Sequence, residues 1–231
     1  MSPLCLPLPK LCIFDCDGTL VDSQHAITAA MGSAFASLGL PEPSAAAVRR
    51  VVGLALADAI ALLHPGGAVA TQAALAHGYV EAFSALRRNG ETREWLYPGV
   101  LDGLAAIAGC GWLLGMATGK SRRGALATLS AHGLCESFAT VQTADLAAGK
   151  PSPDMIHRAL AETGVSAERA VMIGDTTYDM EMAHNAGVVA IGVDWGYHHP
   201  AELLAAGAAV IVDDFAILPD LIEDMVETAA A

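Results

Sequence analysis

Residues 11–23 have the sequence LCIFDCDGTLVDS, which joins a short apolar run to a cluster of acidic residues. The run from Leu11 to Phe14 is continuous and apolar, as in a strand of a parallel sheet that is buried on both faces. Asp15 and Asp17 follow where that strand should end, and side chains two positions apart in a strand point to the same side. Two like charges at the rim of an apolar sheet repel each other unless a cation or a shared proton offsets the repulsion. The stretch therefore predicts a working site at the end of a buried strand.

An ordinary polar turn is the plainer interpretation of the same residues. Asp and Gly favour turns after strands for conformational reasons of their own. Gly18 would let the chain bend sharply and approach a ligand, and Thr19 offers a hydroxyl and a backbone N–H at the bend. Other parts of the chain have to distinguish a functional site from a simple turn.

Length and charge limit the class of protein. The 231 residues suffice for one large domain or for a core with an inserted subdomain. The formal net charge is −13 and basic residues are adjacent only in pairs, so neither nucleic acid nor an anionic membrane is expected as a partner. The most apolar window, residues 100–118, contains Asp102 and several breaks, so a helix followed by a buried strand explains it better than a membrane span.

The cysteines and the start of the chain favour the cytoplasm. The five cysteines lack paired or metal-like spacing and indicate free thiols in a reducing compartment. The first ten residues contain three prolines and no basic residue before their apolar part, so they are a poor signal peptide.

The periodicity of apolar residues changes twice along the chain. Residues 23–94 have helical spacing, with expected helices near residues 27–38, 44–63 and 69–86 and a break at Gly53. From residue 95 onward, helical segments alternate with apolar runs at residues 112–117, 138–141, 170–173, 188–193 and 209–212. This pattern predicts an α/β fold: a Rossmann-like parallel sheet with helices on both faces, formed by residues 1–22 and 95–231, with residues 23–94 as an all-helical insertion. Ligands of such sheets bind beyond the carboxyl ends of the strands.

Polar groups follow three of the expected strands. Thr118 and Gly119 come after the second strand, where a hydroxyl and a backbone N–H can cradle a phosphate or simply cap a helix. Lys150 lies between a glycine and a proline and could equally be a solvated loop lysine. Asp175 and Asp179 follow another buried run and form a second carboxylate pair, although an aspartate cap would explain one of them.

A nucleotide-binding P-loop is a competing interpretation of Gly119-Lys120-Ser121. That motif requires a further glycine at the position that Leu114 occupies, and Gly115 comes one residue too late. The sequence therefore disfavours a P-loop.

Taken together, these segments resemble the haloacid dehalogenase superfamily of phosphatases. The first motif corresponds to residues 15–23, the second to Thr118-Gly119, the third to Lys150-Pro151 and the fourth to residues 174–179, in the order of the family. The resemblance covers nearly the whole chain. Residues 23–94 resemble the helical C1-type cap of the subgroup that includes phosphoglycolate phosphatases.

The resemblance implies a role for each motif residue. Asp15 would be the nucleophile that forms an aspartyl-phosphate, and Asp17 would protonate the leaving oxygen and then take a proton from the attacking water. The Thr118 hydroxyl, the Gly119 N–H and the Lys150 ammonium would hold the phosphate oxygens.

The same resemblance implies Mg²⁺ as the cofactor. Its ligands would be the Asp15 carboxylate, the Asp17 backbone carbonyl and the Asp175 carboxylate, with Asp179 supporting them from nearby. A cation at that point would also offset the repulsion between the paired carboxylates.

Departures from other branches of the superfamily narrow the activity. Asp17 argues against a dehalogenase, and the absence of lysine between Asp22 and Trp95 argues against a phosphonatase that uses a cap lysine. Ile27 stands twelve residues after Asp15, where sugar-phosphate mutases place a histidine, and His25 comes two residues before that position.

We therefore expect a magnesium-dependent phosphatase for a small phosphorylated metabolite, with phosphoglycolate as the leading candidate. The alternatives are another small ester, a nucleotide or pyrophosphate, and, from a different class, a non-catalytic protein that binds a phosphate ligand. Arg49 and Arg50 are candidates for gripping the substrate from the cap, although a solvated helix face is the usual role of such residues. Lys120, Arg122 and Arg123 either offset the negative charge of the chain near the site or face solvent. A monomer or a homodimer is expected.

Overall fold

A six-stranded parallel sheet forms the centre of the molecule. The computed structural model describes residues 8–92 and 94–229. The strand order is β5-β4-β1-β6-β7-β8, and every pair of neighbours is parallel. The strands are β1 (Lys10–Phe14), β4 (Trp112–Thr118), β5 (Phe138–Thr143), β6 (Ala170–Gly174), β7 (Val189–Val193) and β8 (Val210–Val212). The Rossmann-like α/β fold predicted from the sequence is confirmed, and β5 extends two residues beyond the expected apolar run.

Helices cover both faces of this sheet because its strands are apolar on both sides. In β1, Cys12 and Phe14 pack in one apolar cluster, and Leu11 and Ile13 pack in the other. The first cluster includes side chains of α5 (Val100–Gly109), α6 (Arg122–Ala131) and α10 (Leu218–Ala229). The second includes side chains of α7 (Asp154–Thr163), α8 (Thr177–Ala186) and α9 (Pro200–Ala205). Short 3-10 helices occur at Cys135–Ser137, Ala167–Arg169 and Phe215–Ile217.

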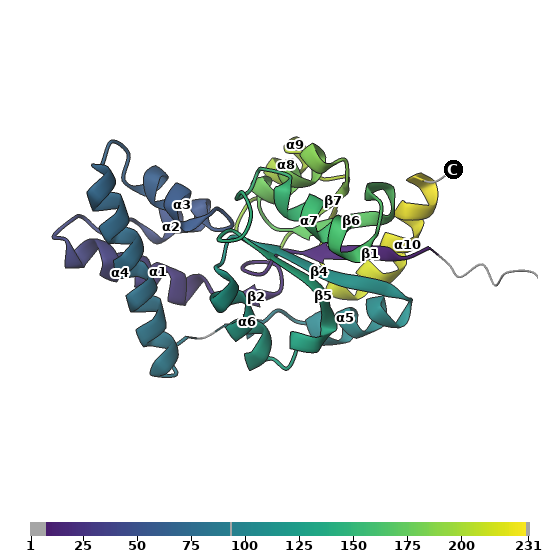
Figure 1. The fold of residues 1–231 in the computed structure, drawn as a ribbon, viewed down its shortest axis with the longest axis horizontal. Coiled ribbons are helices and arrows are strands. Elements are labelled where there is room, and N and C mark those ends of the chain that lie inside the picture. Colours follow the sequence, from purple (N-terminus) through teal and green to yellow (C-terminus); the bar gives the residue numbers. More distant parts are fainter. Residues whose placement is uncertain (1–7, 93, 230–231) are drawn as a thin grey trace, which may run out of the picture.

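The segment between Val21–Asp22 (β2) and Trp95–Leu96 (β3) contains, among its described residues, four helices that form a separate body beyond one end of the sheet (Figure 1). They are α1 (Gln24–Ser37), α2 (Ala45–Val51), α3 (Leu56–Leu63) and α4 (Val69–Arg88). Their inward side chains form an apolar cluster of their own, which includes Met31, Phe35, Ile60 and Leu75. The expected break at Gly53 lies between α2 and α3, and this residue has a φ of +96°. We refer to α1–α4 as the helical insertion.

Two short segments connect the sheet to the helical insertion, and they pair with each other. Residues Val21–Asp22 (β2) and Trp95–Leu96 (β3) form a short antiparallel ribbon, with Val21 opposite Leu96. Strands of two residues are too short to show a pattern in the sequence. The ribbon therefore holds together the two segments through which the chain enters and leaves the helical insertion.

Among the described residues, no helix has both the length and the apolar character that crossing a membrane would require.

Candidate active site

The predicted site residues meet where the strand order reverses around β1. This strand lies between β4 and β6, with Phe14 opposite Met116 on one side and opposite Ile173 on the other. Because parallel strands end at the same edge, Asp15, Thr118 and Asp175 come together from three distant segments. All three are at most 1% exposed. Crevices at such a reversal are the usual ligand sites of open parallel sheets.

Gly18 forms the tight turn that brings the loop after β1 against Asp175. Its φ is +89°, and its N–H donates to the carbonyl of Val21 at 2.8 Å. A Cβ at this position would lie 2.1 Å from Asp175 Oδ2, so no other residue fits without displacing that carboxylate. The next residue, Thr19, donates from Oγ1 to Asp175 Oδ1 at 2.8 Å. The loop of the first motif thus orients the carboxylate of the fourth motif.

Lys150 is completely buried, which excludes the solvated-loop interpretation of this lysine. Its Nζ lies 2.8 Å from Asp15 Oδ1 and 2.6 Å from Asp179 Oδ1. Burial by itself would lower the pKa of Lys150, but the two carboxylates outweigh burial and raise it above its ordinary value. The ammonium is therefore a fixed positive charge between the nucleophile candidate and the fourth motif.

Asp175 and Asp179 are held by different groups. Asp175 Oδ2 accepts a hydrogen bond from the backbone N–H of Tyr197 at 2.9 Å. Asp179 Oδ2 accepts from the backbone N–H and the hydroxyl of Thr176, at 3.0 and 2.7 Å, in a capping box at the start of α8. Asp179 therefore caps a helix, which the sequence allowed for one of the two aspartates, and also reaches Lys150, which the sequence did not predict.

Three carboxylates offer oxygen atoms that fit a hard divalent cation. Ligand atoms of Asp15, Asp175 and Asp179 lie within 4.8 Å of one another, and all three residues are buried. Within the described part of the chain, Asp15 Oδ2 has neither a hydrogen bond nor an ion pair. Burial raises the pKa of Asp15 to about 7 against the opposing effect of Lys150, and burial and the adjacent acids raise the pKa of Asp175. One ammonium does not neutralise three carboxylates, so a cation with oxygen ligands, such as Mg²⁺, fits here.

Asp17 belongs to a second charge network, which includes three residues that the sequence analysis did not assign to the site: Lys120, Glu94 and Arg87. Asp17 Oδ1 lies 2.9 Å from Lys120 Nζ and accepts a short hydrogen bond from Ser23 Oγ. Lys120 Nζ also lies 3.2 Å from Glu94 Oε1, and Arg87 pairs with the other oxygen of Glu94 at 2.7 Å. The sequence left Lys120 either near the site or facing solvent, and the structure shows that its ammonium forms ion pairs inside the protein.

Some features of the sequence pointed to Lys120, but none pointed to Glu94. Lys120 is one of three lysines in the chain and directly follows Gly119. Glu94 lies in the segment that leads into β3, and only the folded ribbon brings it to Lys120. Burial alone would lower the pKa of Lys120, and Asp17 and the other neighbouring groups raise it instead.

The loop after β4 supplies Thr118 and Gly119. Thr118 Oγ1 accepts a hydrogen bond from the Lys120 backbone N–H at 3.3 Å. A Cβ at Gly119 would lie 2.4 Å from the carbonyl oxygen of Leu54, so a glycine is needed where this loop meets the helical insertion. Both residues line a cavity that they share with Asp15 and Asp17.

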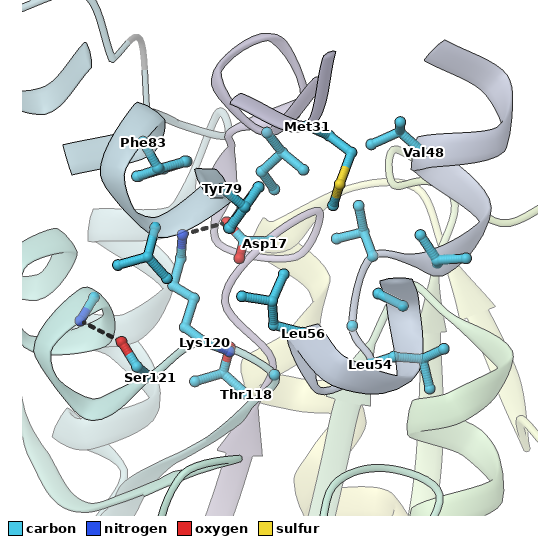
Figure 2. Close-up of a pocket in the computed structure, with 18 of the residues that line it drawn as sticks. Asp17, Met31, Val48, Leu54, Leu56, Tyr79, Phe83, Thr118, Lys120 and Ser121 are labelled. Atoms are coloured by element: carbon cyan, nitrogen blue, oxygen red, sulfur yellow. Dashed lines mark hydrogen bonds and ion pairs between the residues drawn. The ribbon is translucent and has the colours of Figure 1, made fainter. Parts of the chain in front are cut away.

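That cavity has a volume of about 170 Å³ and lies between the end of the sheet and the helical insertion (Figure 2). Arg49 and Arg50, the predicted cap residues for substrate, do not line it. Arg49 donates to Gln24 Oε1 at 3.3 Å, and Arg50 pairs with Glu202 at 2.7 Å; both arginines are exposed. Their contact with a substrate stays a prediction.

Comparisons with known proteins agree on one family. The family model described as haloacid dehalogenase-like hydrolase matches residues 12–193. The chain is 38% identical to a probable phosphatase IndB of Dickeya dadantii over 90% of this chain and 91% of that protein. It is 36% identical to a phosphoglycolate phosphatase of Rhodospirillum rubrum, over 92% and 90%. A solved structure of a predicted phosphoglycolate phosphatase from Haemophilus somnus has the same fold, with a TM-score of 0.81 and 23% identity over 92% of this chain and 97% of that one.

Proposed function

The chain belongs to the haloacid dehalogenase-like hydrolase family, and from that premise we propose that it is a magnesium-dependent phosphatase that hydrolyses a small phosphomonoester through an aspartyl-phosphate. The observation that carries the proposal is Asp15 itself. It is buried at the end of β1 and lines the cavity, Lys150 lies 2.8 Å from one of its oxygens, and its other oxygen has no partner among the described residues. A structural aspartate would have both oxygens satisfied.

Asp15 is the proposed nucleophile. One carboxylate oxygen forms a bond to phosphorus while the bond from phosphorus to the ester oxygen breaks, and water later releases inorganic phosphate and restores the carboxylate. Lys150 favours the ionised form that this attack requires, because its ammonium opposes the effect of burial on the Asp15 pKa.

Asp17 is the proposed acid and base. It lines the cavity beside Asp15, and Lys120 and Ser23 hold its Oδ1, which fixes the orientation of the carboxyl group. The proton given to the leaving oxygen and later taken from water moves at the same carboxyl, so the proton count closes over one turnover.

Thr118, Gly119 and Lys150 are the proposed donors to the phosphate oxygens. Thr118 and Gly119 line the cavity together with Asp15, and Lys150 Nζ lies 2.8 Å from Asp15 Oδ1. In a water-poor site such donors stabilise charge that develops during transfer. A bound Mg²⁺, held by Asp15, the Asp17 carbonyl and Asp175 with support from Asp179, would supply further positive charge against the phosphoryl oxygens.

The helical insertion is the proposed cap that excludes bulk water from the cavity. Phosphoglycolate is the first substrate to test because several relatives bear the name phosphoglycolate phosphatase, and another small ester, a nucleotide or pyrophosphate follows. We also propose a cytoplasmic enzyme, in keeping with the buried free thiols of Cys12 and Cys16.

Phosphate release tests this proposal. The purified protein is assayed on a panel of phosphate esters with Mg²⁺ and with excess EDTA, beside the variants Asp15→Asn and, as a matched control, the exposed Asp102→Asn. We expect release that requires Mg²⁺, is abolished by Asp15→Asn and is unchanged by Asp102→Asn. If folded wild-type protein releases no phosphate from any ester, the enzyme proposal is wrong and a phosphate-binding protein becomes the better account.

A further inference from the structure

The part of the cavity that faces away from the catalytic aspartates is apolar. Side chains from all four helices of the insertion, and from the loop between α2 and α3, line it (Figure 2). Those that Figure 2 labels are Met31, Val48, Leu54, Leu56, Tyr79 and Phe83. Tyr79 and Phe83 stand one turn apart on α4, with ring centroids 5.9 Å apart. Two neighbouring rings give this wall a surface on which a further flat ring can pack. Lys120 Nζ and the Arg87 guanidinium also lie near this wall, each 5.3 Å from the Phe83 ring centroid.

The size of the cavity suits an apolar group of moderate size. Its volume is about 170 Å³. An engineered apolar cavity of roughly 150 Å³ in another protein stays free of water and binds benzene. This volume covers the whole cavity, so a phosphoryl group placed at Asp15 and Thr118 would take up part of it and leave the remainder, on the side of the insertion, for one small organic group.

Most of the cationic side chains that line the cavity already form ion pairs with carboxylates of the protein. Lys120 pairs with Asp17 and Glu94, and Arg87 pairs with Glu94. Arg123 is exposed, so its guanidinium stays hydrated, and within the described residues it donates to Ser84 Oγ at 3.1 Å and forms no ion pair. A substrate carboxylate in the apolar part would therefore lose its hydration without gaining a buried cation that lacks a carboxylate partner of its own, which is costly.

We propose, on the basis of the phosphatase function above, that the natural substrate is the phosphomonoester of an apolar alcohol, with a leaving group about the size of one aromatic ring. The phosphate faces Asp15, the ester oxygen faces Asp17, and the apolar group packs between Leu54, Leu56 and the ring pair of α4. The site accordingly selects against the carboxylate of phosphoglycolate.

Four esters separate this proposal from a preference for phosphoglycolate. The four esters are ethyl, butyl and benzyl phosphate and phosphoglycolate. Each releases an alcohol whose oxygen is bonded to a primary carbon, so all four share one kind of leaving group. Each methylene buried on binding should raise kcat/KM about fourfold. We expect kcat/KM to rise at least about tenfold from ethyl to butyl phosphate, to be highest for benzyl phosphate and to be lower for phosphoglycolate. A kcat/KM for phosphoglycolate above that for benzyl phosphate overturns the proposal.

A pair of variants locates the effect in this cavity. Leu54→Arg places a cation in the apolar lining, and Leu62→Arg places the same side chain on exposed α3 surface of the same insertion, where Leu62 is 58% exposed. Leu54→Arg should lower the ratio of kcat/KM for benzyl phosphate to that for phosphoglycolate by at least about tenfold, in line with the burial of two or more methylenes. Leu62→Arg should leave the ratio unchanged. Circular dichroism and thermal unfolding verify that both variants fold, and an equal change of the ratio in both variants contradicts the proposal.

Binding distinguishes failure of this proposal from failure of the enzyme proposal. Benzylphosphonate and phosphonoacetate carry the organic groups of benzyl phosphate and phosphoglycolate without the ester oxygen. Their P–C bond cannot be hydrolysed by this route, so calorimetry compares their affinities directly. If no ester is turned over, tighter binding of benzylphosphonate still supports the apolar site, and equal or tighter binding of phosphonoacetate rejects it. If esters are turned over with phosphoglycolate preferred, the enzyme proposal stands and the apolar-substrate proposal falls.

Discussion

Replacing Lys150 by methionine removes the one ammonium that lies between Asp15 and Asp179. At 2.8 and 2.6 Å, each ion pair is worth about 6 kcal/mol of attraction at an effective dielectric constant of about 20. Desolvation of the ammonium and of the carboxylates offsets most of this sum. Loss of one partner from a buried pair typically costs about 3–5 kcal/mol, because the remaining charge stays buried without compensation. We expect a loss of that size in the free energy of unfolding of Lys150→Met.

Urea unfolding in EDTA measures this loss, and Lys10→Met is the control. Lys10 forms an ion pair with Glu223 near the surface, and such pairs contribute about 0–1 kcal/mol. The loss for Lys150→Met should also depend on pH. Without the ammonium the pKa of Asp15 rises above about 7, so at about pH 5 its carboxyl is neutral and the loss is smaller than at about pH 8. Losses of similar size for the two variants, or a larger loss at low pH, would refute the assignment of Lys150 as a buried counter-ion.

Three further predictions concern the acid, the first turn and the metal. Asp17→Asn should lower kcat for alkyl phosphates by about 10²–10⁴-fold, as expected for loss of a general acid. It should lower kcat for p-nitrophenyl phosphate much less, because that leaving group needs no proton. Equal losses of kcat on both kinds of ester would show that Asp17 is not the general acid. Gly18→Ala should abolish activity because its Cβ would lie 2.1 Å from Asp175 Oδ2. Gly133 also has a positive φ, but nothing lies within 4 Å of its Cβ position, so Gly133→Ala should cost only about 1–2 kcal/mol of unfolding free energy. Kinetics and urea unfolding compare the two variants, and an active Gly18→Ala variant would contradict the prediction. The rise in melting temperature caused by Mg²⁺ should grow as pH increases through about 7. Protons compete with the cation for Asp15, whose raised pKa favours the neutral carboxyl below that pH. Thermal unfolding at several pH values measures this trend, and a rise in melting temperature that is independent of pH would argue against Asp15 as a ligand.

The sequence predicted the elements that depend on local pattern. Apolar runs such as residues 170–173 marked the strands, and an acidic residue within two positions of the end of such a run marked the edge where the candidate site lies, as for Asp15 and Asp175. The break at Gly53 could be predicted because glycine readily adopts the positive φ that ends a helix, and the structure has this residue at a positive φ. These features persist in the structure because each depends on neighbours within a few residues.

Features that depend on tertiary contacts could not be predicted in this way. A loop lysine is usually exposed, and Lys150 is buried only because β1 and α8 bring Asp15 and Asp179 to it. The network of Glu94 and Lys120 needs the ribbon of β2 and β3, whose two-residue strands carry no periodic signal. The last two residues of β5 were missed because Gln142 and Thr143 are polar, although both are buried.

Trapping the covalent intermediate tests the central claim most directly. Protein quenched during turnover is reduced with borohydride, which converts an aspartyl-phosphate into homoserine, and peptide mass spectrometry identifies the converted residue. The account predicts conversion at Asp15 alone, in the presence of substrate and Mg²⁺ and not in EDTA. Turnover without conversion at Asp15, or conversion at another aspartate, would contradict it.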